Sequence, residues 1–178
     1  MPSDRRWARA LDDHALAVEA FVAAIARVPE TAWHQEPAPG KWSPATVALH
    51  LVDAYELGSR AAIGGASMRL VVPPWRAWIL RKALLPILIM RGRFPRARAP
   101  REVRPNVDAA LALTRPAATE RLRASAQEAA AAFHAAERMP DHQRFVHAYF
   151  GPVSPYQALR MLTAHTQHHT RTLAEQWA

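Results

Sequence analysis

Two Ser-Pro pairs constrain this chain most, because each one places the start of a helix at a defined residue. Ser43 precedes Pro44, and Ser154 precedes Pro155. Serine is a favoured helix N-cap, and proline is tolerated at the first helical position, where no backbone N–H is needed. Gln157 also completes a capping box with Ser154. These signals predict helices that begin at residues 44 and 155.

Both predicted helices carry an apolar stripe whose members recur at spacings of three and four residues, as expected for one face of a helix. The Gly64-Gly65 pair ends the first of them. The two stripes contain Val47, His50, Leu51, Ala54 and Leu57 in the first helix, and Ala158, Leu162, His165, His169 and Leu173 in the second. Three histidines therefore occupy core-facing positions.

The same periodicity predicts two further helices. One runs from about Asp4 to Val28 before Pro29, and the other from about Pro116 to Arg138 with Thr114 as its cap. Their stripes contain Trp7, Leu11, Ala15, Val18, Val22 and Ile25 in the first, and Leu122, Ala126, Ala129 and Phe133 in the second. Half of the residues are hydrophobic, mostly Ala and Leu. We expect an all-α fold, an antiparallel four-helix bundle in a single domain over 1–178.

The connecting segments are less regular. The apolar run WRAWILRKALLPILIM is interrupted by Arg76, Arg81, Lys82 and Pro86, and it is too short for a comfortable membrane span. It fits a helix packed on the bundle, or a partner-binding or interfacial helix. Residues 139–152 are predicted to be a connector that ends in Gly-Pro.

The net charge is +8, and six arginines lie between Arg91 and Arg104, opposed there only by Glu102. Two interpretations stay open: a solvated linker, or a patch for nucleic acid or an anionic membrane surface. No nucleic-acid-binding motif accompanies the cluster. The N-terminal residues have no apolar signal-peptide core, so we expect a cytoplasmic protein.

The chain has no cysteine, so a transition-metal site would have to use imidazole and carboxylate ligands. His165 and His169 are four residues apart on one helix, which lets both rings reach a single ion, and His50 faces the same interior. Three histidine ligands would leave coordination positions open, as in catalytic sites. The alternatives are that each histidine is separately hydrogen-bonded, or that the helices are rotated so that the histidines face outward.

Other polar residues are weaker candidates. His168 and His147 could flank the site, His14 lies at the edge of its helix stripe, and Asp53 could orient His50, although Asp53 and Glu56 also fit solvent-facing charges. Three more histidines have no supporting pattern, namely His34, His134 and His142. No Ser-His-Asp arrangement or glycine-rich phosphate loop is present, and the catalytic residues remain unassigned.

The segments KWSPATVALHL and FGPVSPYQALRMLTAHTQHHTRTL resemble the DinB-like superfamily, which includes the YfiT-like proteins. In that family a Trp-Ser-Pro entry leads into a helix with one metal-binding histidine, and the last helix carries a His-x-x-x-His pair. These positions correspond to His50, His165 and His169. The resemblance implies an up-down-down-up bundle with a long crossover between helices two and three, here at about 64–105. It also implies homodimers and nickel, zinc or iron. The Arg/Pro-rich crossover departs from the family pattern.

Two functions follow as hypotheses. Characterised relatives include thiol-dependent transferases and isomerases, so the first is a metal-dependent transferase that acts on a small-molecule substrate with a low-molecular-weight thiol. A metal-dependent hydrolase would have the same sequence features. The second is a non-catalytic binding or stress-response module whose basic crossover contacts nucleic acid, membrane or protein.

Overall fold

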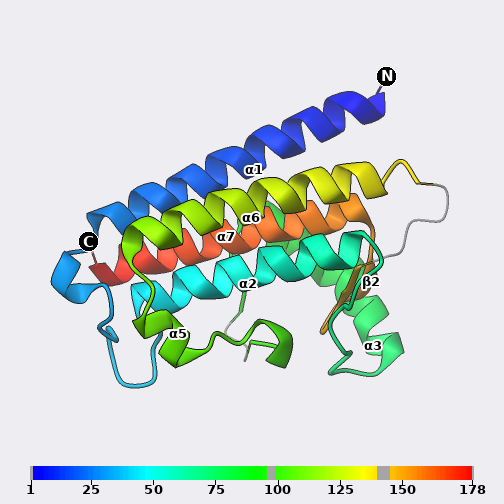
Figure 1. Ribbon diagram of the computed structural model, residues 1–178. Coiled ribbons are helices and arrows are strands. Elements are labelled where there is room, and N and C mark those ends of the chain that lie inside the picture. Colours follow the sequence, from blue (N-terminus) through cyan, green and yellow to red (C-terminus); the bar gives the residue numbers. More distant parts are fainter. Residues whose placement is uncertain (1, 96–98, 140–144, 178) are drawn as a thin grey trace.

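The fold is dominated by four long helices. The computed structural model describes residues 2–95, 99–139 and 145–177. The long helices are α1 (Pro2–Arg27), α2 (Pro44–Ala62), α6 (Arg115–Ala136) and α7 (Pro155–Trp177), and they lie side by side. Figure 1 shows α2 and α6 running in one direction and α1 and α7 in the other. The prediction of a mostly helical protein is confirmed.

The predicted helix starts are confirmed by their caps. The Ser43 hydroxyl accepts a hydrogen bond from the amide of Thr46 at 3.2 Å. In the capping box, Ser154 Oγ accepts from the Gln157 amide at 3.2 Å, and Gln157 Oε1 accepts from the Ser154 amide at 3.1 Å. Thr114 caps α6 through the amide of Ala117. Each bond satisfies an amide that lacks a partner within the helix.

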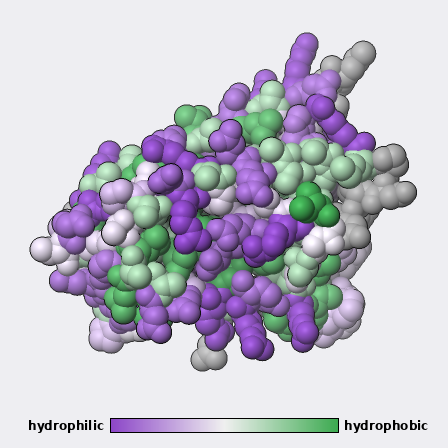
Figure 2. Space-filling model, viewed as in Figure 1, coloured by the Kyte–Doolittle hydropathy of each residue, from purple (hydrophilic) through white to green (hydrophobic). Residues whose placement is uncertain are grey.

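One core joins all four long helices. Its largest fully buried side chains include Phe21 and Ile25 of α1, Tyr55 and Leu51 of α2, Leu122 and Phe133 of α6, and Leu159 and Leu173 of α7. On the outside, hydrophilic residues cover most of the face in Figure 2, with hydrophobic residues in smaller patches between them. The predicted stripe of α1 was wrong at one position, because Ala15 is exposed and His14 is buried instead.

The crossover between α2 and α6 is built from short pieces. After α2 come helix α3 (Pro74–Ile79), the π-helical turn η2 (Leu80–Leu84) and helix α4 (Leu85–Arg91). The 3-10 turn η3 (Arg101–Val103) and helix α5 (Val107–Leu111) follow, and a further 3-10 turn, η1 (Glu30–Ala32), lies between α1 and α2. Helix α4 packs against α7, whereas η3 and α5 pack against α2. Of the alternatives for the apolar run, packing on a long helix is therefore observed for its second part, α4.

Among the residues that the structure describes, no helix is long and apolar enough to cross a membrane. Of the arginine cluster at 91–104, Arg96 and Arg98 lie outside the described residues. Arg93 forms an ion pair with Glu175 of α7 at 2.9 Å. The cluster is therefore partly engaged with the last long helix.

The connector before α7 contains a β-hairpin that the sequence did not reveal. Strand β1 (Phe145–His147) pairs antiparallel with β2 (Gly151–Val153), so that Val146 faces Pro152. The amides of Met68 and Val71 donate to the carbonyls of Val146 and Ala148 at 3.1 and 2.9 Å. The hairpin thus ties the start of the crossover to the start of α7. Each strand has only three residues, too few for a period-two pattern.

Candidate metal centre

The structure brings His50, His165 and His169 together. His50 lies in the first half of α2, and His165 and His169 lie one turn apart on α7. The Nε2 atom of His165 is 3.2 Å from Nε2 of His50 and 3.0 Å from Nε2 of His169. Three ring nitrogens from two helices thus converge on one point, as the stripes predicted.

Hydrogen bonds between neutral rings do not account for this convergence. His50 Nδ1 lies 2.6 Å from the carbonyl oxygen of Val103, which can only accept, so the ring proton of His50 is on Nδ1. Nε2 of His50 is then an acceptor, and His165 would have to donate to it from Nε2. That same nitrogen cannot also accept from His169. Two short N···N contacts therefore share a single proton.

A divalent ion resolves this conflict, because each Nε2 can then point a lone pair at the ion. Two ligands about 2.1 Å from one ion, at right or tetrahedral angles, lie about 3.0–3.4 Å apart. The observed separations of 3.0 and 3.2 Å match that range. Within the described part of the chain, no other group of three His, Cys, Asp or Glu side chains has the spacing to hold a metal.

Burial keeps these imidazoles neutral, the form that binds metal. Burial lowers the pKa of His50 to about 4, because the charged ring would lose its hydration. The pKa values of His165 and His169 lie well below the ordinary value, chiefly through burial and further through the neighbouring histidines. The three rings are thus available as ligands across the neutral pH range.

Two aromatic side chains lie beside the cluster. The Trp42 ring lies 4.8 Å from the ring of His50 and stacks at 6.5 Å with that of His169. The Phe94 ring contacts that of His165 edge-on at 5.7 Å. Sequence reasoning assigned no role to Trp42, Phe94 or Val103. Trp42 could have been found from its place beside the Ser-Pro cap, whereas no sequence signal marks the other two.

The weaker candidates lie around the cluster. His168 Nδ1 accepts a bond from the Phe94 amide at 3.3 Å, which links α7 to the crossover. His147 accepts from the Tyr149 amide at 3.2 Å and stacks on Phe150, and burial lowers its pKa to about 4. His147 also lies close enough to His165 to depress the pKa of that ring. Both histidines thus lie beside the site, the less favoured of the two interpretations that the sequence left open.

Three other predicted positions have different roles. His14 is a buried core residue between Thr163 Oγ1 and the Ala126 carbonyl, at 3.3 Å from each, and is not part of the metal cluster. The Nδ1 partner of His50 is the Val103 carbonyl, so Asp53 does not orient this ring and the alternative of a solvent-facing charge is left for it. Glu56 pairs with Arg121 at 3.1 Å on the surface.

His34 and His134 stay apart from the cluster, as predicted. His34 is exposed beside Trp33, and His134 contacts Arg138 and the ring of Trp7. His142 lies outside the described residues.

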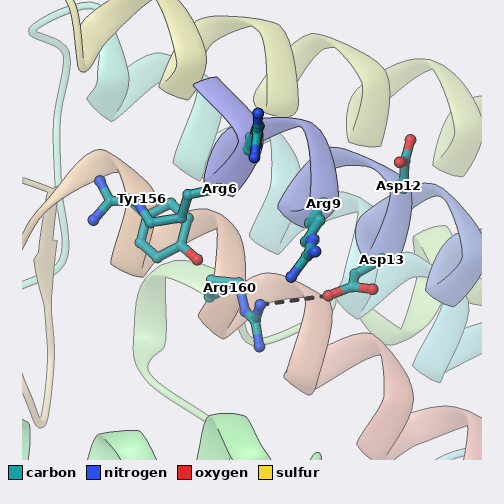
Figure 3. Close-up of a pocket in the computed structure, with 7 residues that line it drawn as sticks. Arg6, Arg9, Asp12, Asp13, Tyr156 and Arg160 are labelled. Atoms are coloured by element: carbon teal, nitrogen blue, oxygen red, sulfur yellow. Dashed lines mark hydrogen bonds and ion pairs between the residues drawn. The ribbon is translucent and has the colours of Figure 1, made fainter. Parts of the chain in front are cut away.

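A separate hollow of about 1040 Å³ lies between the first half of α1 and the start of α7 (Figure 3). Arg160 pairs there with Asp13 at 3.4 Å, and the Arg6 guanidinium lies 4.1 Å from the centre of the Tyr156 ring. Figure 3 shows these side chains on the facing surfaces of the two helices. The complete lining is Arg5, Arg6, Arg9, Asp12, Asp13, Tyr156 and Arg160. It contains no histidine, so this groove is not part of the metal centre.

The chain matches the DinB superfamily over residues 15–173. No curated protein and no solved structure gives a significant match. The match includes His50, His165 and His169 and both helices that carry them. Members of this superfamily typically bind metal, and the convergent histidines have the geometry for it. The chain belongs to the DinB superfamily.

Proposed function

We propose that this protein is a metal-dependent transferase that acts on a small-molecule substrate with a low-molecular-weight thiol. His50, His165 and His169 are the metal ligands, and zinc, nickel and iron are the candidate ions. The four long helices then form the single-domain, up-down-down-up bundle of the family, with the segment at about 64–105 as its crossover. The convergence of three neutral Nε2 atoms is the observation that carries the proposal.

The chain's own residues supply the setting for this chemistry. A divalent ion held by three histidines has open coordination positions, so it can bind a thiol as thiolate and lower its pKa. Trp42 and Phe94 place apolar ring surfaces beside the cluster, where they exclude water and contact an electrophile. In the transfer, the thiol gives up its proton to solvent, the sulfur forms a bond to the electrophilic carbon, and the leaving group departs with the electrons of the broken bond and takes a proton from solvent.

The thiol would come from outside the chain, because the protein has no cysteine. A cytoplasmic setting belongs to the same proposal, since thiols are kept reduced there. A homodimer, which the family resemblance implies, is the expected assembly. Sedimentation of the purified protein measures its mass directly.

The first test is metal content, measured by elemental mass spectrometry on protein purified without a His-tag or metal column. Wild type should carry near-stoichiometric metal, and His50→Ala, His165→Ala and His169→Ala should each lose it. His168→Ala is the matched control, because that histidine neighbours the ligands yet bonds the Phe94 amide instead. A wild type that stays metal-free when supplied with zinc, nickel and iron would overturn the site.

The second test is turnover of a panel of electrophiles with and without added thiol. The transferase is supported if the electrophile is consumed only when thiol is present, and if this reaction is abolished in each ligand variant. Turnover without thiol that also needs the three histidines assigns a hydrolase instead. The non-catalytic alternative is favoured if the metal-loaded protein turns over no electrophile. The ligand variants should then bind nucleic acid, membrane or protein as the wild type does.

A further inference from the structure

The crossover presents an apolar face that no described part of the chain covers. Along the continuous helical segment 74–91, the exposed large apolar side chains are Trp75, Trp78, Ile79, Ile87 and Met90, and they are 41–76% exposed. Trp75 and Trp78 are 66% and 55% exposed, although tryptophan usually buries most of its large ring. We refer to these five residues as the crossover face.

Local backbone geometry keeps this face continuous. The residues of the segment that are not exposed occur at 77, 80–81, 84–85 and 88–89, a repeat of four residues, and the exposed residues lie between them. A regular α-helix has 3.6 residues per turn, so a repeat of four would drift around its surface. The π-helical turn η2 lies in the middle of the segment, and its wider turn offsets that drift. Both tryptophans and Met90 therefore share one side.

The opposite side of the segment is fixed to the body of the protein. Ala77 is buried against Gly151 of the hairpin, and Arg81 donates to the carbonyl oxygen of Pro152. Leu85 and Leu88 are buried where α4 packs on α7. Arg171 of α7 donates to the carbonyl oxygen of Gly92 at the end of α4. The crossover face is thus held outward on a rigid base.

The charge along the stretch of sequence that contains the face has one sign. Between Glu56 and Glu102 the sequence contains ten Lys or Arg residues and no Asp or Glu. Lys82 lies within the exposed surface, and Arg76 and Arg91 are exposed beside it. Tryptophan and aliphatic side chains flanked by basic residues are typical of helices that lie in the interface of an anionic membrane.

We propose that the crossover face binds the surface of an anionic phospholipid bilayer. Trp75, Trp78 and Met90 enter the boundary between headgroups and acyl chains, and Lys82, Arg76 and Arg91 contact the lipid phosphates. The lack of acidic residues favours lipid over a second copy of this chain, whose equivalent surface would carry the same positive charge. The exposed Ile79, Ile87 and Met90 favour lipid over nucleic acid, which is contacted by cations and stacking aromatic rings.

Co-sedimentation of the full-length protein with vesicles tests the proposal. We expect binding to vesicles of phosphatidylcholine with phosphatidylglycerol, and weak binding to phosphatidylcholine alone. Replacing Trp75 and Trp78 by Ser should raise the lipid concentration for half-maximal binding by about tenfold or more, and so should Lys82→Glu with Arg76→Glu. The control is Leu16→Ser with Leu111→Ser, which changes two comparably exposed apolar residues, 71% and 58%, on other helices.

A second measurement locates the contact. Lipids with brominated acyl chains should quench tryptophan fluorescence in the wild type and much less in Trp75→Phe with Trp78→Phe, because Phe still inserts but does not report. Unchanged thermal melting of the variants shows that the fold is intact. Failure to bind anionic vesicles, equal binding by the control pair and the Trp pair, or vesicle binding that needs neither tryptophan would each overturn the proposal. A change of sedimentation mass in the Trp variants without lipid binding would assign the face to self-association instead.

Discussion

The Nδ1 atom of His50 donates a hydrogen bond of 2.6 Å to the carbonyl oxygen of Val103, 53 residues further along the chain. This bond fixes the ring tautomer and turns Nε2 toward His165 and His169. Partners of this kind orient metal-binding histidines and raise the basicity of the ligand nitrogen. The crossover is therefore a structural part of the candidate metal centre, and not merely a link between α2 and α6.

Loosening the packing of Val103 should weaken the site without removing a ligand. The Val103 side chain is 3% exposed, so Val103→Ala leaves the 3-10 turn less firmly held against α2. We expect metal affinity to fall about tenfold while stoichiometry is unchanged, measured by competition with a chelator. Val18→Ala removes an equally buried valine of α1 and should leave affinity unaltered. Equal losses in both variants would contradict a positioning role for η3.

Removal of the metal should destabilise the fold, because an ion that binds only the folded state adds to its stability. At a free metal concentration 100 times the dissociation constant, the gain is about 2.7 kcal/mol. Treatment with a chelator should therefore lower the melting temperature of the wild type by several degrees, followed by circular dichroism. His165→Ala should melt at the same temperature with and without chelator. A shift that persists in that variant would place the stabilising metal elsewhere.

Much of the helical part could be predicted because its signals are local. Ser43-Pro44 and the Ser154–Gln157 capping box determine helix starts through residues within one turn, and the apolar stripes determine which side faces the core. The meeting of His50 with His165 followed from those stripes. Phe94 and Val103 could not be predicted, because they reach the site through the tertiary packing of a segment without regular periodicity. A backbone carbonyl partner also carries no side-chain signature.

The capping box at the start of α7 should contribute measurably to stability. Ser154→Ala removes the acceptor for the Gln157 amide and should cost about 1 kcal/mol in the free energy of unfolding, from urea titration. Gln157→Ala leaves the Ser154 amide without its partner but should cost less, because alanine favours helix at this position inside α7. Gln127→Ala replaces an exposed residue inside α6 and should change stability little, since alanine favours helix. A cost for Gln127→Ala equal to that for Ser154→Ala would contradict the capping interpretation.

Gly58 allows α2 to approach α6 and α7 closely. A Cβ atom at this position would lie 3.2 Å from Phe133 and 3.3 Å from Leu162, tighter than ordinary contact. Gly58→Val should therefore destabilise the protein by about 1–3 kcal/mol through overpacking, measured by urea unfolding. Ala20→Val adds similar bulk at an exposed position of α1 and should have a small effect. A cost for Gly58→Val no larger than that for Ala20→Val would contradict crowding at this position.

His14 should make stability fall as the solution is acidified. Burial lowers its pKa in the folded state, against about 6.5 in the unfolded chain. Well above pH 6.5 neither state binds the proton, so the group has no pH effect there. As the pH falls through 6.5 toward the folded-state pKa, the unfolded state takes up a proton that the folded state does not, and unfolding becomes more favourable.

The slope due to one such group is at most about 1.4 kcal/mol per pH unit. His14→Gln removes the titrating ring but retains an amide that can reach Thr163 Oγ1 or the Ala126 carbonyl. Between pH 7 and pH 5 this variant should lose less stability than the wild type, measured by thermal melts at each pH. The absolute stability of the variant does not enter this comparison, and acid release of metal affects both proteins alike. His34→Gln, at an exposed loop position, is the control and should keep the wild-type slope. If His14→Gln also kept that slope, the uncharged, buried state of His14 would not contribute to acid sensitivity.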